Sequence, residues 1–385
     1  MAKVLLVDTN FSSAPIYRAL LTAGHEVHVV GANPSDCLAK QAAHYWRMDY
    51  SDTDALSELV DNQHFDYLVP GCTDRSYESC VAVGRGRFAG LDSRDAMLAI
   101  NHKATFRRIA ATLGLPVPAL FPGAEAANGR AVIVKPVDSF SGKGITVLHD
   151  ASRADIEQAA AIARDTSSSG EALIEEFVEG QLYSHSAFLA AGKVKCDFLV
   201  REDGTANRFV VDTSKVVDPA EHSLLLATLR ECVEKLAGHL ALQDGLIHTQ
   251  FIANGSRVWL IEMTRRCPGD LYSQLIELTT GYPYARSYAL AFLGQEPAPR
   301  NAGMLRPIMR HTISVPTAQP FDHVRFLRSL EIVRYVPLSL VGDPLRPSPN
   351  SRVAIIFCHE QNQMALDDLY HVTLRRELYA VADGT

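Results

Sequence analysis

Apolar runs of strand length alternate with helical patterns through the first 84 residues, and this order constrains the fold more than any other feature. The apolar runs suit buried parallel strands and cover residues 3–8, 26–30 and 66–70. The helical patterns lie between or after them, over about residues 13–23, 54–63 and 74–84. Strands alternating with helices build a doubly wound α/β layer with right-handed crossovers. We therefore expect an N-terminal α/β domain over residues 1–100.

The first strand-to-helix turn argues against a classical NAD-binding domain. It reads Asp8-Thr9-Asn10-Phe11-Ser12-Ser13 and contains no glycine. A dinucleotide fingerprint needs glycines at this turn, so that the backbone can approach the pyrophosphate.

The pattern changes after residue 100. A helix over residues 103–113 ends at Gly114, and the prolines of Leu115-Pro116-Val117-Pro118 impose an extended segment. Strands, one long helix and a hairpin follow, over residues 131–136, 145–150, 172–177, 185–190, 194–200, 207–213, 220–241 and 246–263. We expect an α+β domain over residues 101–300, with a lid lobe at about 115–178. A smaller strand-rich region should cover residues 301–385.

The composition is that of a soluble globular protein and argues against several partner classes. Of the 385 residues, 47% are hydrophobic and 21% charged. The net charge of −7 argues against nucleic acid and anionic membrane as partners. Seven cysteines without CxxC spacing predict reduced thiols. The first apolar run is too short for a signal peptide, and no run approaches the roughly 18 residues of a membrane helix. We expect a cytoplasmic protein.

Residues 131–148, AVIVKPVDSFSGKGITVL, carry a first candidate for phosphate binding. Lys135 ends a predicted strand, and a small polar loop with glycines runs from Asp138 to Gly144. Inward-turned backbone amides in such loops bind phosphate oxygens, and lysine adds a compact positive charge. The alternative is an ordinary hairpin with a solvated lysine.

A second candidate lies in residues 172–180, ALIEEFVEG, where an apolar strand gives way to acidic residues and then glycine. Adenine presents one donor and one acceptor edge, which an extended backbone can match. The alternative is a strand end with solvated acids.

The third candidate is the predicted hairpin of residues 245–270, with Asn254-Gly255 as its turn signal. Glu262, Thr264 and Arg266 alternate along its second strand and should share one face. A carboxylate, a hydroxyl and an arginine suit a magnesium–phosphate complex. The alternative is a polar strip that faces solvent.

Gln250 and Glu262 should reach the same site only if this hairpin is irregular. A two-residue turn at Asn254-Gly255 would put them on opposite faces of the hairpin. A three-residue turn with a left-handed Gly255 and a bulge would bring them together.

The three segments, in this order and spacing, resemble the ATP-grasp superfamily over about residues 1–300. The similarity is to the branch with biotin carboxylase, the purine-pathway carboxylate ligases and the bacterial L-amino-acid ligases. The resemblance implies an α/β pre-ATP-grasp domain followed by two lobes that clamp ATP. It also implies ATP and Mg²⁺ as cofactors.

The resemblance assigns roles to individual residues. Lys103 and Lys135 would contact ATP phosphates, and Arg266 matches the arginine of the family's E-x-N-x-R strand. Glu175 would meet the adenine amino group. The magnesium ligands would be Glu262, Gln250 and Thr264. The remaining nucleotide contacts would come from the loop and the hinge, namely Ser139, Ser141, Gly142, Lys143, Gly144, Glu176, Phe177, Val178 and Glu179.

Three positions depart from the family pattern. Gln250 and Thr264 stand where the family usually has Glu and Asn, so the implied metal site has one less negative charge. Leu182 stands where a ribose-binding Glu is common, and Glu179 is the candidate to replace it.

The function implied is an ADP-forming carboxylate–amine ligase that activates a carboxylate as an acyl phosphate. Arg266 and Lys215 are the expected catalytic residues. An acceptor site should lie between the N-terminal domain and the large lobe, lined by Asn10, Ser12, Thr73, Asp74, Asp212, Ser214 and Lys215. The partners would be small-molecule carboxylate and amine substrates, and a homodimer is common among similar proteins. The alternatives are an ATP-grasp kinase, a carboxylate–thiol ligase, and a nucleotide-binding regulator with reduced catalysis.

Overall fold

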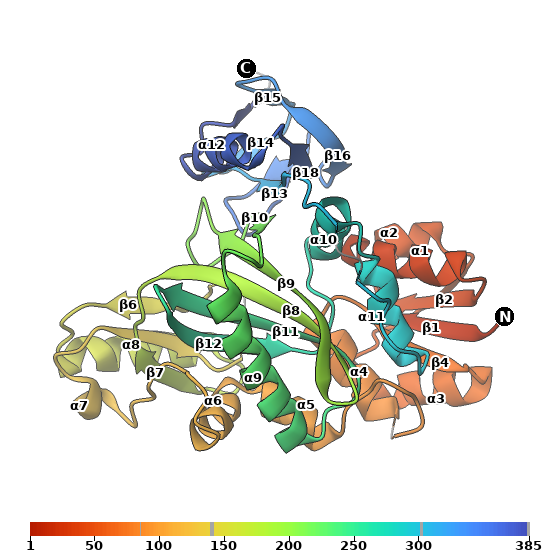
Figure 1. Cartoon of the computed structure of the whole chain (residues 1–385), viewed down its shortest axis with the longest axis horizontal. Coiled ribbons are helices and arrows are strands. Elements are labelled where there is room, and N and C mark those ends of the chain that lie inside the picture. Colours follow the sequence, from red (N-terminus) through yellow and green to blue (C-terminus); the bar gives the residue numbers. More distant parts are fainter. Residues whose placement is uncertain (85, 139–141, 301–302, 383–385) are drawn as a thin grey trace.

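The computed structural model describes residues 1–84, 86–138, 142–300 and 303–382. Its N-terminal sheet has four parallel strands in the order β3-β2-β1-β4, which lie at the right of Figure 1. The strands are β1 (Lys3–Val7), β2 (Glu26–Gly31), β3 (His44–Arg47) and β4 (Tyr67–Pro70). The helical elements are η1 (Phe11–Ser13), α1 (Ala14–Thr22), α2 (Cys37–Gln41), α3 (Thr53–Gln63), α4 (Asp74–Gly84) and α5 (Arg94–Asn101). The predicted doubly wound layer is thus confirmed.

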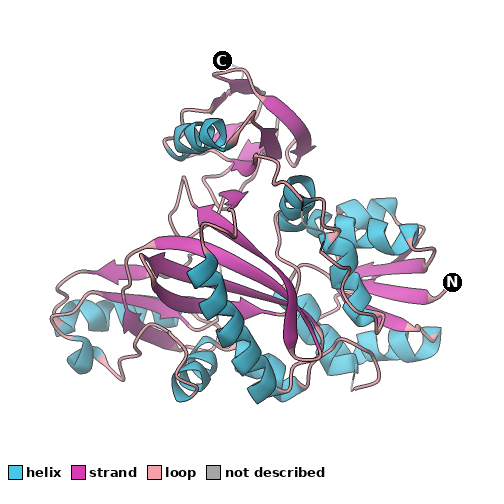
Figure 2. Cartoon of the chain, viewed as in Figure 1, coloured by secondary structure: helices cyan, strands magenta, loops and turns pink. Residues whose placement is uncertain are grey.

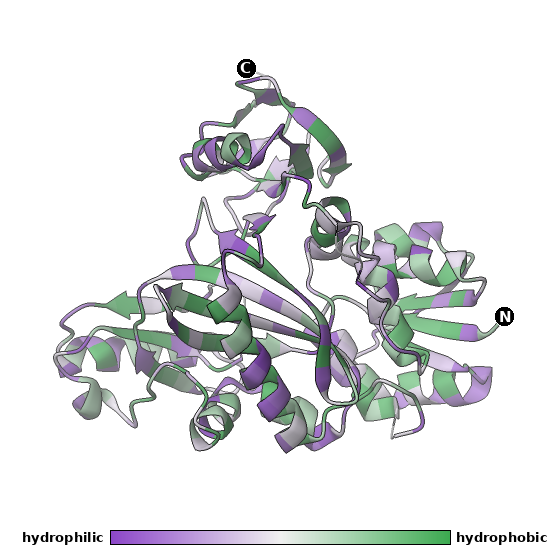
Figure 3. Ribbon diagram, in the orientation of Figure 1, coloured by the Kyte–Doolittle hydropathy of each residue, from purple (hydrophilic) through white to green (hydrophobic). Residues whose placement is uncertain are grey.

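Strand β3 pairs with β2, although no pattern in the sequence predicts it. Its residues, His44–Arg47, are half-buried or exposed, as befits the outer strand of a sheet. An edge strand of this kind has no continuous apolar run, so hydrophobic periodicity does not detect it. The strands β1 and β2 are mostly hydrophobic in Figure 3.

A three-stranded sheet of order β6-β5-β7 follows, packed against α8. Its small core of valine, isoleucine and alanine side chains includes Val132, Val134, Ile156 and Ala160. The strands are β5 (Val132–Pro136), β6 (Thr146–Leu148) and β7 (Ala172–Glu176). The helices nearby in sequence are α6 (Lys103–Thr112), α7 (Ala124–Ala127) and α8 (Arg153–Thr166).

An antiparallel sheet of eight strands has the order β12-β11-β8-β9-β10-β13-β18-β16. It runs from the middle of the molecule to the top of Figure 1, and its strands are magenta in Figure 2. Five strands precede residue 300: β8 (Gln181–Ala190), β9 (Lys193–Asp203), β10 (Thr213–Val216), β11 (Gly245–Asn254) and β12 (Arg257–Thr264). Three follow it: β13 (Ile308–Ile313), β16 (Glu331–Pro337) and β18 (Ala354–His359). The strand-rich region after residue 300 therefore continues this sheet, and the boundary at residue 300 stays a prediction.

Helices and short strands complete this part of the chain. The helices are α9 (Ser223–Leu240), α10 (Tyr272–Thr280), α11 (Tyr284–Phe292) and α12 (Gln363–Leu374). The short strands are β14 (Gln319–Pro320), β15 (Val324–Phe326), β17 (Pro344–Leu345) and β19 (Tyr379–Val381). Among the described residues, no helix is both long and apolar enough to cross a membrane.

Residues 207–212 are not a strand, contrary to the sequence prediction of a strand over 207–213. The carboxylate of Asp212 accepts hydrogen bonds from the backbone amide and the hydroxyl of Thr205. These bonds fold residues 205–212 into a turn, and β10 begins only at Thr213. The apolar run over residues 209–211 resembles a strand in sequence, because hydrophobic periodicity does not reveal local hydrogen bonds of side chains.

The two faces of the eight-stranded sheet differ. Buried leucines of α9 pack on one face, against side chains such as Leu189, Leu199 and Ile247. The residues that alternate with these, among them Ser184, Ser186 and His248, point to the opposite face. The face opposite α9, here called the polar side, also carries buried apolar residues such as Phe188, Phe198 and Leu246, and it carries the site.

Candidate functional site

A cavity of about 350 Å³ lies on the polar side of the eight-stranded sheet, next to the N-terminal sheet. Residues that follow β1 and β4 reach it, namely Asn10, Ser12, Cys72 and Thr73. The strands β1 and β4 are neighbours, while β2 and β3 continue on the other side of β1. The carboxyl ends of strands at such a switch point form the usual binding crevice of an open α/β sheet.

The second strand of the hairpin brings Glu262, Thr264 and Arg266 to this cavity. Their shared face, predicted from strand alternation, is therefore present. Thr264 Oγ1 donates to Asp74 Oδ1 at 3.1 Å, and Arg266 donates to both oxygens of Asp74 at 2.8 and 3.2 Å. Asp74 begins α4, so these bonds join the hairpin to the N-terminal domain.

Gln250 lies directly opposite Glu262 in the β11–β12 ladder, because the hairpin carries a bulge. The hairpin closes between Asn254 and Arg257, and Gly255 in the turn has φ 59°. The register then shifts at Gln250, leaving Ile261 as the extra residue of β12. The expected bulge exists, but it lies in the strand and not in the turn.

Arg107 explains why the bulge is stable at this position. Its Nη2 donates to the carbonyl oxygen of Ile261 at 2.7 Å, and its Nε pairs with Glu175 Oε1 at 2.8 Å. The guanidinium thus satisfies a polar group that the bulge removes from the ladder. Sequence reasoning missed Arg107, because an arginine within a helical pattern is usually solvated.

Glu175 is also paired with Lys135 Nζ, and its side chain and those of Arg107 and Lys135 are almost fully buried. Burial opposes the ionisation of Glu175, but Lys135 and Arg107 outweigh it and lower the pKa of its carboxyl. The carboxylate is therefore engaged within the protein, and its contact with an adenine amino group stays a prediction.

Glu202 on β9 is a further carboxylate of the cavity, and the sequence did not single it out. It accepts hydrogen bonds from Gln250 Nε2 at 2.7 Å and from Ser184 Oγ at 2.8 Å. Its side chain is buried, and burial raises the pKa of the carboxyl. Acidic residues at the end of an apolar strand are usually solvated, so no sequence signal separates this one.

Two arginines from beyond residue 300 also line the cavity. Arg310 on β13 donates to Ser214 Oγ at 3.0 Å and to the backbone oxygen of Asp270 at 2.8 Å. Arg352 pairs with the carboxylate of Asp270, and its guanidinium lies 5.3 Å from the ring centroid of Phe11. All three parts of the chain thus contribute to one cavity.

The glycine-rich loop joins β5 to β6. Ser139 and Ser141 lie outside the described residues. Gly142 and Gly144 have φ of 70° and 71°, a left-handed conformation that favours glycine. A Cβ on Gly142 would come within 2.9 Å of Phe209 Cβ, so the loop also packs closely here. Lys143 between them is exposed.

The predicted hinge follows β7. The backbone amide of Glu176 donates to Ala119 O at 2.9 Å, and that of Phe177 donates to Ala131 O at 3.0 Å. Val178 is buried, whereas Glu179 is exposed. Their nucleotide contacts stay predictions.

The two remaining lysines lie in different surroundings. Lys103 is half-buried at the start of α6, where His102 caps the helix. Lys215 is buried on β10 and pairs with Asp367 of α12. Its neighbour Ser214 meets Arg310 at the cavity, so strand alternation turns Lys215 to the other face. The catalytic role expected for Lys215 stays a prediction.

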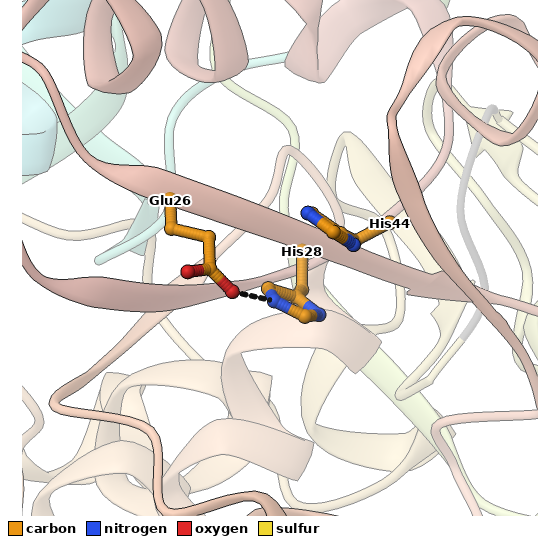
Figure 4. Close-up of side chains that lie close together, drawn as sticks. All are labelled: Glu26, His28 and His44. Atoms are coloured by element: carbon orange, nitrogen blue, oxygen red, sulfur yellow. Dashed lines mark hydrogen bonds and ion pairs between the residues drawn. The ribbon is translucent and has the colours of Figure 1, made fainter.

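One group of three potential metal ligands is found among the described residues, outside the cavity: Glu26, His28 and His44 (Figure 4). His28 Nε2 is 2.7 Å from Glu26 Oε1, and Trp46 Nε1 donates to His28 Nδ1 at 3.1 Å. Indole can only donate, so Nδ1 must accept and Nε2 must carry the proton. His28 therefore has no free lone pair for a metal in this arrangement.

Comparison with known proteins finds a family model that matches part of the chain. Residues 129–274 match the ATP-grasp domain family. The chain is 31% identical over 189 residues to a formate-dependent phosphoribosylglycinamide formyltransferase of Burkholderia mallei, which covers 46% of each protein. The corresponding protein of Corynebacterium efficiens is 27% identical over 188 residues, again covering 46% of each. The chain thus spans about half the length of the curated relatives it matches.

Similarity to solved structures extends over the whole chain. The L-amino acid ligase of Bacillus licheniformis covers 100% of this chain and 99% of its own, with a TM-score of 0.79 and 16% identity. Phosphoribosylglycinamide synthetase of Anaerococcus prevotii covers 99% of each chain, with a TM-score of 0.74 and 16% identity. Biotin carboxylase of Campylobacter jejuni covers 99% of this chain and 92% of its own, with a TM-score of 0.75 and 14% identity. Residues 129–274 thus match the ATP-grasp domain family, and the chain as a whole shares the fold of these solved structures.

Proposed function

We propose that this protein is an ADP-forming ligase that activates a small carboxylate as an acyl phosphate for attack by an amine. The observation that carries the proposal is the composition of the cavity. It joins the strip Glu262, Thr264 and Arg266 to Asn10 and Thr73 at the switch point of the N-terminal sheet. The strip that would bind phosphate thereby faces a crevice that is large enough for an acceptor substrate.

The oxygen ligands of the cavity fit magnesium. Glu262 offers a carboxylate, Gln250 an amide oxygen and Thr264 a hydroxyl, and all three line the same space. Mg²⁺ prefers such hard oxygen ligands and takes few of them from the protein. When bound with ATP, the ion supplies neutralisation of phosphate charge.

Positively charged side chains of the protein would neutralise the remaining phosphate charge. Lys103, Lys135 and Arg266 would bind phosphate oxygens and stabilise charge that develops during phosphoryl transfer. Asp74 holds the Arg266 guanidinium in place through two hydrogen bonds. A guanidinium oriented in advance loses less entropy when it binds an anionic group. The loop around Gly142 would close over the nucleotide and keep water from the acyl phosphate.

Two alternatives have the same fold, namely a kinase and a carboxylate–thiol ligase. The identity of the product distinguishes each of them from the proposed ligase. The regulator with reduced catalysis is favoured by the neutral Gln250 and Thr264, and it is opposed by Glu262 and Arg266 in the same cavity.

The test is a screen of pooled carboxylic acids and amines with Mg·ATP, followed by ADP quantification and mass spectrometry of the products. We expect ADP to appear only when both substrates are present, together with an amide product. A phosphorylated product without an amine would support the kinase instead. Nucleotide binding with no turnover in any pool would support the regulator. Sedimentation of the same sample would check for the homodimer.

A further inference from the structure

A row of polar side chains crosses the eight-stranded sheet beneath the cavity. Glu262 pairs with Gln250, and Gln250 pairs with Ser184. Glu202 pairs with Ser214, and Ser184 Oγ donates to Glu202 Oε1. These residues come from five consecutive strands, so the backbone ladder fixes their spacing. Glu202 and Glu262 are the two carboxylates in the row, one on each side of Gln250.

The orientation of the Gln250 amide follows from this row. Its Nε2 donates to Glu202 Oε2 at 2.7 Å. A carboxylate can only accept, so the amino end of the amide must face Glu202. The carbonyl end is then turned away from Glu202, and it is the only end that can coordinate a cation.

Glu202 also supplies to the cavity the negative charge that the neutral Gln250 does not provide. A glutamate at 250 would place its charge on β11, whereas here it stands on β9, one hydrogen bond away. Both residues line the same cavity as Glu262. At such short range a carboxylate attracts a divalent cation even when it is not a ligand.

We propose that Glu202 is a positioning residue for the metal site. It fixes Gln250 with its oxygen towards the cation, and it supplies the second negative charge of the site. Glu202 and Gln250 thus act together in place of one glutamate. The proposal rests on the proposed function, because it concerns the metal that accompanies the nucleotide.

The test measures metal binding directly, without an acceptor substrate. Mn²⁺ is titrated into the full chain saturated with ADP, and free Mn²⁺ is followed by electron paramagnetic resonance. Glu202→Gln keeps the size of the side chain, and its one amide oxygen can accept from Gln250 while its amide nitrogen donates to the hydroxyl oxygen of Ser184. The variant removes the charge and keeps a partner for Gln250, so we expect Mn²⁺ affinity to fall by about tenfold or more. Glu231→Gln on the exposed side of α9 is the matched control, and its affinity should equal that of the unmodified chain.

An exchange of the two residues gives the sharper result. Gln250→Glu alone places two carboxylates within hydrogen-bond distance, so it should not improve on the unmodified chain. The double variant Glu202→Gln, Gln250→Glu keeps one carboxylate and one amide in contact. Its Mn²⁺ affinity should return to within about threefold of the unmodified chain, a difference of about 0.6 kcal/mol.

The outcomes separate this inference from the proposed function. If the unmodified chain binds no Mn²⁺ with ADP, the proposed function itself fails. If it binds Mn²⁺ and Glu202→Gln binds equally well, only the role of Glu202 is overturned. A double variant no better than Glu202→Gln would overturn the partnership with Gln250. Circular dichroism and the melting temperature of each variant report whether it is folded.

Discussion

Glu262 is the exposed carboxylate of the cavity, in contrast to the buried Glu202. Its exposure leaves it available to a bound cation, and its position on β12 is fixed by the ladder with β11. A residue of this kind should matter for catalysis and little for folding, because its loss leaves no buried group unpaired.

The variant Glu262→Gln tests this division. We expect kcat/KM for ADP formation to fall. The decrease should correspond to a loss of about 3–4 kcal/mol of transition-state stabilisation, which is the scale for a key electrostatic group. The free energy of unfolding should change by less than about 0.5 kcal/mol. Steady-state kinetics with the substrates found by screening, and urea unfolding, measure the two quantities. Near-normal turnover would show that the metal site lies elsewhere.

Glu175 shows the opposite behaviour, because it lies between two buried cations, Lys135 and Arg107. Glu175→Gln should destabilise the protein by about 3–5 kcal/mol, the usual cost of removing one partner of a buried ion pair. The half-buried Glu176 on the same strand provides the control, and Glu176→Gln should cost far less. Urea unfolding of both variants checks the difference. Equal stability of the two would contradict the network.

At the scale of elements, the bulge at Ile261 decides which side chains meet. Without the extra residue, Gln250 would face Ile261 and not Glu262, since the pairing up to Phe251 and Leu260 is regular. Strand alternation in the sequence was enough to predict the strip of Glu262, Thr264 and Arg266. The position of the bulge depends on Arg107, which is 154 residues away from Ile261 in sequence. Such a contact is set by tertiary packing, so local patterns do not contain it.

The difference between local patterns and tertiary contacts also explains which other elements could be predicted from the sequence. The buried strands of the N-terminal sheet were predictable because they are continuous apolar runs. The edge strand β3 and the turn at Asp212 were not, since exposure and local hydrogen bonds govern them. Glu202 could not be predicted for a further reason. Its importance comes from its contact with Gln250, which lies on another strand.

The glycine-rich loop between β5 and β6 should respond to nucleotide. Gly142 and Gly144 hold left-handed conformations and bear no side chain to limit access to their amides. Hydrogen exchange of these two amides should slow at least severalfold when Mg·ATP is added, because phosphate oxygens would accept from the loop. The hairpin turn at Gly255 is the internal control and should not change. Unchanged exchange at Gly142 and Gly144 would mean that the segment is only a hairpin loop.

For the whole molecule, the main expectation is that ligand binding stabilises an assembly of three parts around one cavity. Mg·ATP at 100 times its dissociation constant should add roughly 2.7 kcal/mol to the free energy of unfolding. A thermal-shift titration should show a rise in melting temperature that EDTA greatly reduces. No rise at any concentration would count against nucleotide binding.

The pairing of β10 with β13 has a consequence for how the chain can be divided. The two strands are joined by backbone hydrogen bonds, although one precedes residue 300 and the other follows it. Cutting the chain at residue 300 would leave the outer side of β10 without a partner strand. Exposed edges of this kind recruit strands from other molecules, and the result is aggregation. Strands β13, β18 and β16 thus cover the edge that β10 would otherwise expose, and a chain shortened at residue 300 should precipitate.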